Sequence, residues 1–286
     1  MLYNSVKTVL QKNLFVFTDL DGTLLSFRKQ EFKSIKPFIS NLNSRGVHLI
    51  PNSSKCFSEI LPLMVELQLR TPFITENGAA IFIPNDYLEK KPIEAKEFRN
   101  YWVIKLGTEK EIINNKIKHS NFKEFSKYSL FLKNMTQLQQ SYYTGIKLGS
   151  LKEGLLKEYG EPFIWMGNKE KLEEFKHILN EEGLSITTGA RLLHLTGLNS
   201  KGDAMSKLLE ELKLQGMEDI ATIACGDSPN DISMLELADY AVVIRLPDKK
   251  NMVLSRRSNI SNSKKIAPEG WQEALEEIDL IKNILK

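Results

Sequence analysis

LFVFTDLDGTLLS, residues 14–26, places two aspartates directly behind an apolar run. The run is as long as a strand and shows no polar alternation, a pattern typical of a strand covered on both faces of a parallel sheet. Asp19 and Asp21 come at its carboxyl end, where open α/β sheets bind their ligands. Two carboxylates this close repel each other unless a cation lies between them. The stretch therefore predicts a parallel sheet with a cation site at one edge.

Strands and helices alternate in the first and last thirds of the chain. Helices are predicted over 30–45, 55–69, 199–213 and 230–238, with a last helix near 268–278, and strands over 47–54, 72–84, 219–228 and 240–246. This alternation predicts an α/β fold with a doubly wound, Rossmann-like parallel sheet.

The middle third follows a different pattern. A strand over 101–107 leads into a Lys/Asn-rich stretch, and strands over 161–167 and 184–197 flank a helix over 168–183. We interpret this part as an α+β lobe inserted into the first domain. The predicted domains are residues 1–84 and 197–286 for the core and 85–196 for the insertion.

Composition excludes several classes of protein. A net charge of +3, spread over many lysines and glutamates, gives no reason to expect nucleic acid or a membrane surface as partner. No run of about 18 apolar residues predicts a spanning helix, and residues 1–13 lack the apolar core of a signal peptide. With only Cys56 and Cys225 present, we expect a reducing, cytoplasmic location. The oligomeric state stays open.

Further polar residues stand where the other predicted strands end or helices begin. Each has an ordinary explanation alone: a helix cap, a turn residue or a solvated lysine. Together they gather at the edge that holds Asp19 and Asp21, which turns alone do not explain. They are Ser53, Ser54, Lys201, Asp227, Asn230 and Asp231.

These residue types predict phosphoryl transfer through a covalent aspartyl intermediate. Asp19 is the predicted nucleophile, and Asp21 the general acid and then the general base. Mg²⁺ is the expected metal, held by Asp19, the Asp21 carbonyl and Asp227. Lys201 is expected to bind phosphate oxygens and Asp231 to orient Lys201 or a metal-bound water. Ser53, Ser54 and Asn230 are further candidates for phosphate binding.

At these residues the chain resembles the haloacid dehalogenase superfamily of phosphatases. DLDGTLL (19–25), NSSK (52–55), Lys201 and GDSPND (226–231) are similar to its four motifs and occur in the same order. Because the inserted lobe lies between the second and third motifs, the resemblance implies a C2-type cap of the IIB form.

Within the superfamily the chain is similar to the mannosyl-3-phosphoglycerate phosphatase family, which includes relatives acting on the glucosyl compound. FTDLDGTLL (17–25), GARLLHLTG (189–197) and APEGWQEAL (267–275) carry this resemblance. It implies hydrolysis of a small phosphorylated sugar-glycerate to the hexosylglycerate, a compatible solute. Leu192 and Lys157 depart from the family pattern in the cap, so the choice between mannosyl and glucosyl substrates stays open.

A basic, polar cap suits a substrate that carries a phosphate and a carboxylate. Lys157 and Arg191 are candidates for the carboxylate, and Thr188 and Gly189 for further contacts. An ion pair at the surface or between the lobes is the alternative for Arg191. Alternative functions are another capped sugar-phosphate phosphatase, a phosphohexomutase, or a binding protein built on an inactive core.

Overall fold

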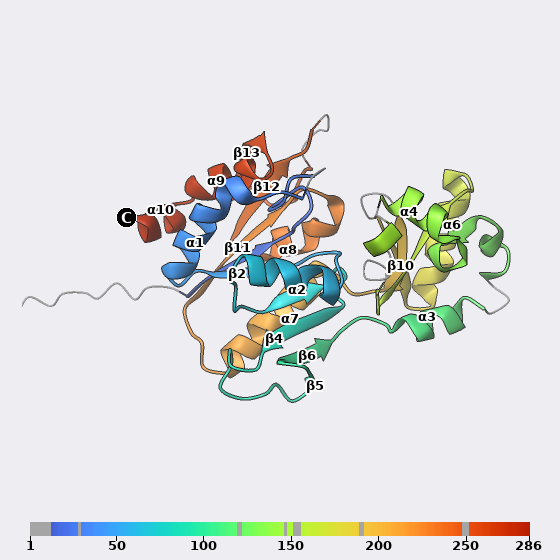
Figure 1. Ribbon diagram of the computed structural model, residues 1–286, viewed down its shortest axis with the longest axis horizontal. Coiled ribbons are helices and arrows are strands. Elements are labelled where there is room, and N and C mark those ends of the chain that lie inside the picture. The colour runs from blue at the N-terminus through green and yellow to red at the C-terminus, as the bar shows by residue number, and fades with distance from the viewer. Residues whose placement is uncertain are drawn as a thin grey trace, which may run out of the picture.

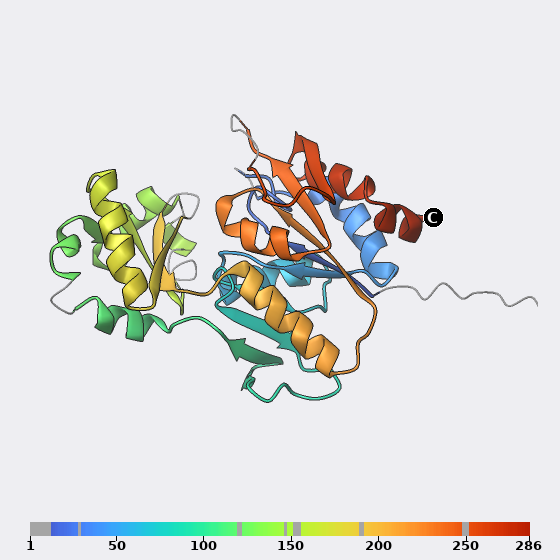
Figure 2. The ribbon, with the colours of Figure 1, turned by 180° about the vertical axis from the view of Figure 1, so that it is seen from behind.

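The chain forms two lobes, which Figures 1 and 2 show from opposite sides. The computed structural model describes residues 13–27, 30–118, 122–145, 148–150, 156–188, 192–247 and 252–286. The larger lobe contains both ends of the described chain, and the smaller lobe contains the middle of the sequence.

A five-stranded parallel sheet forms the centre of the larger lobe. Its order is β13-β12-β11-β1-β2. The strands are β1 (Asn13–Thr18), β2 (His48–Pro51), β11 (Ile220–Gly226), β12 (Tyr240–Arg245) and β13 (Ile260–Ile266). Four of them follow predicted strands. β13 was not predicted, because its polar sequence ISNSKKI lies at the sheet edge and buries little.

The apolar run of β1 is buried on both faces of this sheet, as its sequence predicts. Leu14 and Val16 pack with one set of helices, and Phe15 and Phe17 pack on the opposite face. The first set is α1 (Lys36–Ser44), α2 (Phe57–Glu66), α9 (Glu269–Glu276) and α10 (Asp279–Leu285). The opposite face carries α7 (Lys201–Leu214) and α8 (Ile232–Leu237). A short 3-10 helix, η1 (Lys33–Ile35), precedes α1, and η6 (Pro229–Asp231) precedes α8.

A second, antiparallel sheet extends the larger lobe. Its order is β3-β4-β6-β5, with β3 (Phe73–Thr75), β4 (Ala80–Pro84), β5 (Lys96–Phe98) and β6 (Tyr101–Lys105). Ile104 of β6 packs in the same hydrophobic cluster as Leu208 of α7. This packing assigns β5 and β6 to the core, whereas the sequence placed them in the insertion that begins at residue 85. We therefore propose that the cap begins near Gly107.

The smaller lobe, the cap, is an antiparallel sheet with helices. The sheet order is β7-β8-β10-β9. Its strands are β7 (Ser129–Phe131), β8 (Gly160–Trp165), β9 (Leu184–Thr188) and β10 (Leu193–Gly197). The helices are α3 (Lys110–Lys116), α4 (Gln137–Thr144) and α6 (Lys169–Glu181), with 3-10 turns η3 (Phe125–Lys127), η4 (Leu132–Asn134) and η5 (Leu148–Ser150). Phe163, Phe175 and Leu195 are among the residues of its own hydrophobic cluster.

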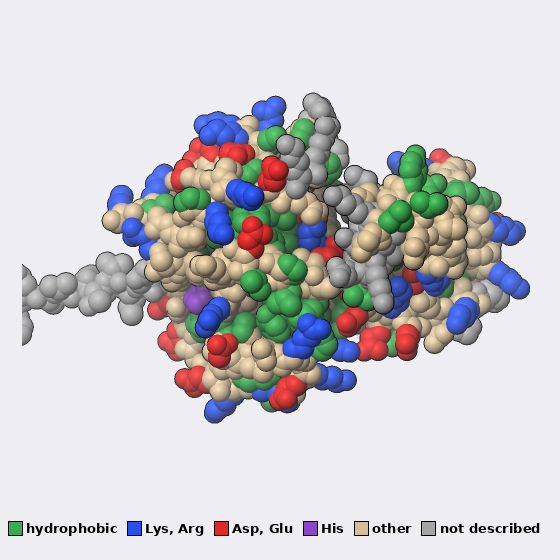
Figure 3. All heavy atoms as spheres, viewed as in Figure 1, with side chains coloured by type: hydrophobic (Ala, Val, Ile, Leu, Met, Phe, Trp, Pro, Cys, Tyr) green, Lys and Arg blue, Asp and Glu red, His purple; other side chains and the backbone are tan. Residues whose placement is uncertain are grey.

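Charged side chains of both signs are interspersed over the face of the molecule that Figure 3 shows. Among the described residues, no helix combines the length and the apolar character needed to cross a membrane.

Candidate active site

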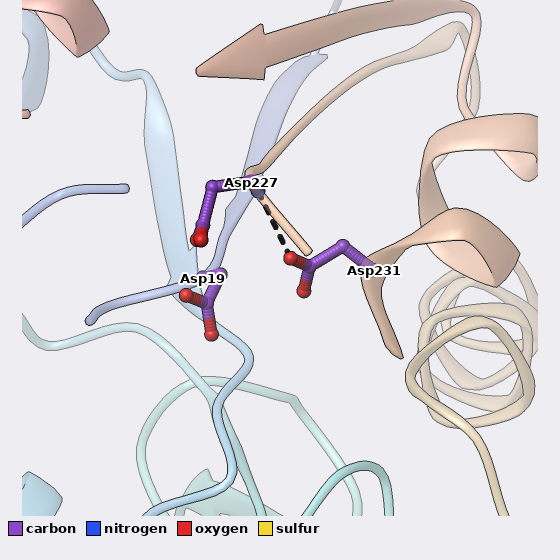
Figure 4. Close-up of side chains that lie close together, drawn as sticks. All are labelled: Asp19, Asp227 and Asp231. Atoms are coloured by element: carbon purple, nitrogen blue, oxygen red, sulfur yellow. Dashed lines mark hydrogen bonds between the residues drawn. The ribbon is translucent and has the colours of Figure 1, made fainter. Parts of the chain in front are cut away.

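The carboxyl ends of β1 and β11 bring two aspartates together. Asp19 follows β1 and Asp227 follows β11, and the two strands pair in parallel up to Thr18 and Cys225. The Asp19 amide donates to the Cys225 carbonyl at 2.9 Å, which continues the ladder to the sheet edge. Figure 4 shows Asp19, Asp227 and Asp231 converging at this edge. One oxygen from each of the three carboxylates lies within 4.8 Å of the others.

Lys201 supplies a positive charge inside this group. It is the first residue of α7, which Ser200 caps through a hydrogen bond from the Asp203 amide. The Lys201 ammonium is fully buried and donates to Asp19 Oδ1 at 2.5 Å and to Asp231 Oδ1 at 2.6 Å. Burial opposes its charge, but the two carboxylates outweigh burial and raise the pKa of Lys201. Lys201 is therefore protonated and joins the first and fourth motifs.

Both carboxylate oxygens of Asp231 accept hydrogen bonds. Its Oδ1 accepts from Lys201, and its Oδ2 accepts from the amides of Asp227 and Ser228, both at 3.0 Å. These contacts connect Asp231 to Lys201 and to the loop that carries Asp227, and its role in orienting them stays a prediction.

Asp227 keeps one oxygen available. Its Oδ1 accepts from the Thr23 hydroxyl at 2.7 Å, while its Oδ2 has no hydrogen bond to any described residue. Gly22, at φ +93°, passes so close that a Cβ there would lie 3.0 Å from this oxygen. Asp19 Oδ2 is likewise without a hydrogen bond to a described residue. Three buried carboxylates face the single charge of Lys201, and the available oxygens of Asp19 and Asp227 fit a hard divalent cation.

The pKa values of Asp19 and Asp227 reflect their burial and the excess of negative charge among the three carboxylates. Burial raises the pKa of Asp19 to about 6, although Lys201 acts in the opposite direction. Burial, followed by the charges of Asp19 and Asp231, raises the pKa of Asp227 to about 8. Without a metal, Asp227 therefore ionises less readily than an ordinary aspartate.

Asp21 lies apart from the lysine network and has a basic partner of its own. Its Oδ2 forms a 2.8 Å ion pair with Lys55, whereas its Oδ1 is buried and has no partner among the described residues. Burial opposes the charge of Lys55, but Asp21 outweighs it and raises the pKa of that lysine. One carboxylate oxygen is thus held in place while the other is available to a reactant.

The predicted phosphate-binding side chains have different surroundings. Ser53 is fully buried, and its hydroxyl oxygen accepts the Lys55 amide at 3.3 Å. Ser54 lines the cavity described below. Asn230 lines it too, and its amide nitrogen donates to Asn77 Oδ1 at 3.0 Å.

A cavity of about 460 Å³ lies between core and cap above these groups. The core lines it with Asp19, Asp21 and Asp227, and the cap lines it with Ile186–Thr188 of β9. A larger cavity of about 760 Å³ shares Phe27 and Leu246 with it but lacks the aspartate and lysine network. The smaller cavity is therefore the one lined by the candidate catalytic residues.

Two of the four cap candidates lie within the described residues. Thr188 lines the cavity, and its contact with the substrate stays a prediction. Gly189 and Arg191 lie outside the described residues. The Lys157 ammonium donates to the Ser54 carbonyl at 2.6 Å, so it contacts the core loop of the second motif. Its predicted role at the substrate carboxylate stays a prediction.

Three residues of this neighbourhood were not singled out from the sequence. Thr23 holds Asp227, Lys55 holds Asp21, and Asn77 holds Asn230. Thr23 and Lys55 lie inside the first two motifs, so their positions could have identified them as site residues. Asn77 lies in the turn TENG after a predicted strand, and that turn shares the edge of the site.

Comparison with known proteins places this geometry in a family. The model of the haloacid dehalogenase-like hydrolases matches residues 16–250. A relative from Methanococcoides burtonii, called glucosyl-3-phosphoglycerate/mannosyl-3-phosphoglycerate phosphatase, is 33% identical over 266 residues, which are 93% of this chain and 96% of the relative. A mannosyl-3-phosphoglycerate phosphatase from Pyrococcus horikoshii is 35% identical over 231 residues, or 80% and 89% of the two chains.

The fold has a solved counterpart. A phosphatase of the haloalkanoate enzyme superfamily from Bacteroides thetaiotaomicron has a TM-score of 0.66 at 17% identity, covering 98% of this chain and 100% of that one. At this identity the likeness concerns the fold alone. A sugar phosphatase of subclass IIB of the same superfamily has a TM-score of 0.53, also at 17% identity, and covers 80% of this chain and 86% of its own. Together with the family match, these two likenesses confirm the predicted doubly wound core with an inserted C2-type (IIB) cap.

Proposed function

This chain belongs to the haloacid dehalogenase-like hydrolase family and is a phosphoric monoester hydrolase, and from that premise we propose its reaction and substrate. The reaction is the Mg²⁺-dependent hydrolysis of mannosyl-3-phosphoglycerate, glucosyl-3-phosphoglycerate or both to the hexosylglycerate. The observation that supports it best is the buried chain Asp19–Lys201–Asp231 with Asp227 beside it, open to a cavity under the cap.

Asp19 is the proposed nucleophile. One carboxylate oxygen forms a bond to phosphorus while the bond from phosphorus to the substrate's C3 oxygen breaks, which leaves an aspartyl phosphate. Lys201 holds Oδ1, and Oδ2 has no other partner among the described residues, so Oδ2 is the oxygen we assign to the attack. With a pKa of about 6, Asp19 is largely ionised at neutral pH even before a metal binds.

Asp21 is the proposed general acid and base. Its Oδ1 gives a proton to the leaving C3 oxygen, and in the second step it takes a proton from the water that attacks phosphorus. The bond between phosphorus and Asp19 then breaks and releases inorganic phosphate. The Lys55 ion pair at Oδ2 keeps the other oxygen directed at the cavity.

The transferring phosphoryl group needs donors around it. Lys201 is placed to stabilise the charge on its oxygens, together with the hydroxyls of Ser53 and Ser54 and the amide of Asn230. Asp231 acts through Lys201 and through the two amides that it accepts.

Mg²⁺ fits the donor set of Asp19, the Asp21 carbonyl and Asp227. When bound, it supplies positive charge to the phosphate and lets Asp19 and Asp227 ionise together. Asp227 is held ready by Thr23. We do not assign Asp231 to the metal, because both its oxygens are already in use.

The cap supplies the contacts to the leaving group. β9 lines the cavity opposite the aspartates, so Thr188 is proposed to contact the sugar or the glycerate. Gly189 and Arg191 follow Thr188 within three residues; Arg191 remains a candidate for the carboxylate and Gly189 for a further contact. The relatives' names cover both sugars, which supports a hexosyl-3-phosphoglycerate and leaves both epimers within the proposal. The free thiols of Cys56 and Cys225 support a cytoplasmic location, where a compatible solute would be made.

Phosphate release from mannosyl- and glucosyl-3-phosphoglycerate, with Mg²⁺ and with EDTA, tests the proposal. We expect release from at least one of them, its loss in EDTA, and its abolition in Asp19→Asn while the circular dichroism spectrum is unchanged. Release from neither substrate rejects the substrate assignment. Full activity of Asp19→Asn in EDTA rejects the mechanism.

A further inference from the structure

The turn between β3 and β4 has an unusual backbone. Glu76, Asn77 and Gly78 have consecutive φ values of +48°, +57° and +91°. The left-handed region costs a residue with a side chain roughly 1–2 kcal/mol, and such strain persists where the surroundings hold it. Glu76 and Asn77 are only 5% and 6% exposed, although turns usually face solvent. Their buried polar groups therefore need partners.

Glu76 binds a segment of the cap. Its two carboxylate oxygens accept the amides of Glu158 and Tyr159 at 2.9 and 3.1 Å. Tyr159, although it belongs to the cap, is 2% exposed and packs in the main hydrophobic cluster of the core. The Glu76 amide itself donates to the Lys55 carbonyl at 3.0 Å. One residue thus connects the second motif to the base of the cap.

Asn77 makes three contacts to three different segments. Its amide donates to the Ser53 carbonyl at 2.9 Å, and its carbonyl accepts the Asn199 side chain at 3.1 Å. Its side-chain oxygen accepts the Asn230 side-chain nitrogen at 3.0 Å. Asn199 lies on the segment that returns from the cap to α7. Asn77 therefore joins the second motif, the returning segment and the fourth motif.

The contact between Asn77 and Asn230 orients the Asn230 side-chain amide. A side-chain amide nitrogen carries two hydrogens, and Asn77 accepts one of them. The Ser228 hydroxyl donates to Asn230 Oδ1 at 2.7 Å, a shorter contact than the 3.2 Å to Asp231 Oδ2, so it holds the oxygen end of the Asn230 amide. With both ends held, the second hydrogen of the nitrogen has a set direction at the wall of the cavity.

We propose that Asn77 is a positioning residue for phosphoryl transfer, which orients the Asn230 amide toward the substrate phosphate and ties it to the segment returning from the cap. This inference rests on the proposed phosphatase function. Asn77 does not line the cavity, so it acts only through Asn230. A freely rotating Asn230 would stabilise the transferring phosphate less, and a loss of about one hydrogen bond's net worth corresponds to a roughly tenfold lower kcat.

The test uses Asn77→Gly, because glycine tolerates a φ of +57° and only the side chain is lost. The matched control is Asn259→Gly: Asn259 has φ +56°, is exposed and has no side-chain hydrogen bond to a described residue. Hydrolysis of p-nitrophenyl phosphate with saturating Mg²⁺ is measured below the thermal midpoint of each variant. We expect kcat to fall roughly tenfold in Asn77→Gly, with a smaller change in KM, and to stay unchanged in Asn259→Gly. Asn77→Ala removes the same side-chain amide, but alanine is more strained than glycine at this φ. Because the lost amide is the shared change, kcat must fall by the same factor in both variants.

A double-mutant cycle with Asn230→Ala separates positioning from a structural role. If Asn77 acts through Asn230, the double variant Asn77→Gly/Asn230→Ala has the kcat of Asn230→Ala alone. Three results would overturn the proposal. They are a double variant in which the kcat losses of the two single variants multiply, an unchanged kcat in Asn77→Gly, and an unchanged kcat in Asn230→Ala. Because p-nitrophenyl phosphate carries no sugar, the result does not depend on whether a hexosyl-3-phosphoglycerate is the natural substrate.

Discussion

At the scale of the residue, the site is a balance of buried charges. Lys201 lies between Asp19 and Asp231 with no exposure to solvent, so its charge is stable only because both carboxylates contact it. Asp227 adds a third carboxylate, and within the described part of the chain Lys201 forms hydrogen bonds with Asp19 and Asp231 but not with Asp227. Each group of the site therefore depends on the others for its charge state.

Replacing Lys201 tests that dependence. Lys201→Met leaves Asp19 and Asp231 buried without their cation, and breaking a buried pair in this way costs about 3–5 kcal/mol. Urea unfolding of the metal-free protein measures the loss. Lys213→Met, at the exposed end of α7, is the control and should stay within about 0.5 kcal/mol of the parent. Lys201→Met/Asp231→Asn should regain part of the loss, and a double variant less stable than Lys201→Met would contradict this account.

The raised pKa values predict how metal binding depends on pH. As the proposed ligands of Mg²⁺, Asp227, with a pKa of about 8, and Asp19, with a pKa of about 6, would both have to ionise for the metal to bind. Binding at neutral pH therefore releases close to one proton, mainly from Asp227. The apparent affinity for Mg²⁺ should weaken about tenfold for each pH unit below 8, and more steeply below 6.

Calorimetry in two buffers with different ionisation enthalpies measures the number of protons released. Asp227→Asn is the matched variant: it weakens binding overall, and its proton release near neutral pH should disappear. Equal affinity at about pH 6 and pH 8, with no proton release by the parent protein, would show that these carboxylates are already ionised without metal.

At the scale of the element, the sequence predicts the helices and strands that are buried and misses those that are exposed. β1, β2, β11 and β12 have apolar runs because parallel strands are covered on both faces, so pattern alone found them. The aspartates behind β1 and β11 could be placed together because paired parallel strands end at one edge. α4 has no buried residue, so it lacks the apolar stripe that marks a helix and was not predicted. The contacts of Asn77 were unpredictable for a different reason: they depend on three segments meeting in space.

The turn of Asn77 has a steric test at Gly78. A Cβ at Gly78 would lie 1.9 Å from the Ser200 carbonyl oxygen, at φ +91°. Gly216 has a similar φ of +83°, but no atom lies within 4 Å of its Cβ position. Gly216→Ala should cost about 1–2 kcal/mol from backbone strain alone. Gly78→Ala should cost about 1–3 kcal/mol more, because backbone must move. Equal urea midpoints for the two variants would mean that the turn and the start of α7 are not in contact.

At the scale of the whole molecule, polar contacts beside the active site join the two lobes, in addition to Tyr159 of the cap, which packs in the core's hydrophobic cluster. Glu76 accepts amides from Glu158 and Tyr159, and Lys157 donates to the Ser54 carbonyl. Ser54 lines the cavity, so the cap contacts the same loop that is proposed to bind phosphate. The sequence predicted a cap that supplies substrate contacts. It could not reveal that a cap lysine would contact core backbone, because that contact depends on how the lobes are oriented.

Lys157 therefore has two candidate roles that one pair of substrates separates. 3-Phosphoglycerate and glycerol 3-phosphate differ by a carboxylate, so a lysine that binds the carboxylate matters only for the first. A lysine that holds the cap on the Ser54 loop matters for both. Because its ammonium is already on the Ser54 carbonyl, we expect Lys157→Met to raise KM roughly tenfold for both compounds. Lys176→Met, in the partly exposed ion pair with Glu173 on α6, should change neither. A rise in KM confined to 3-phosphoglycerate would assign Lys157 to the substrate carboxylate instead, and would mean that its contact with the core is given up when substrate binds.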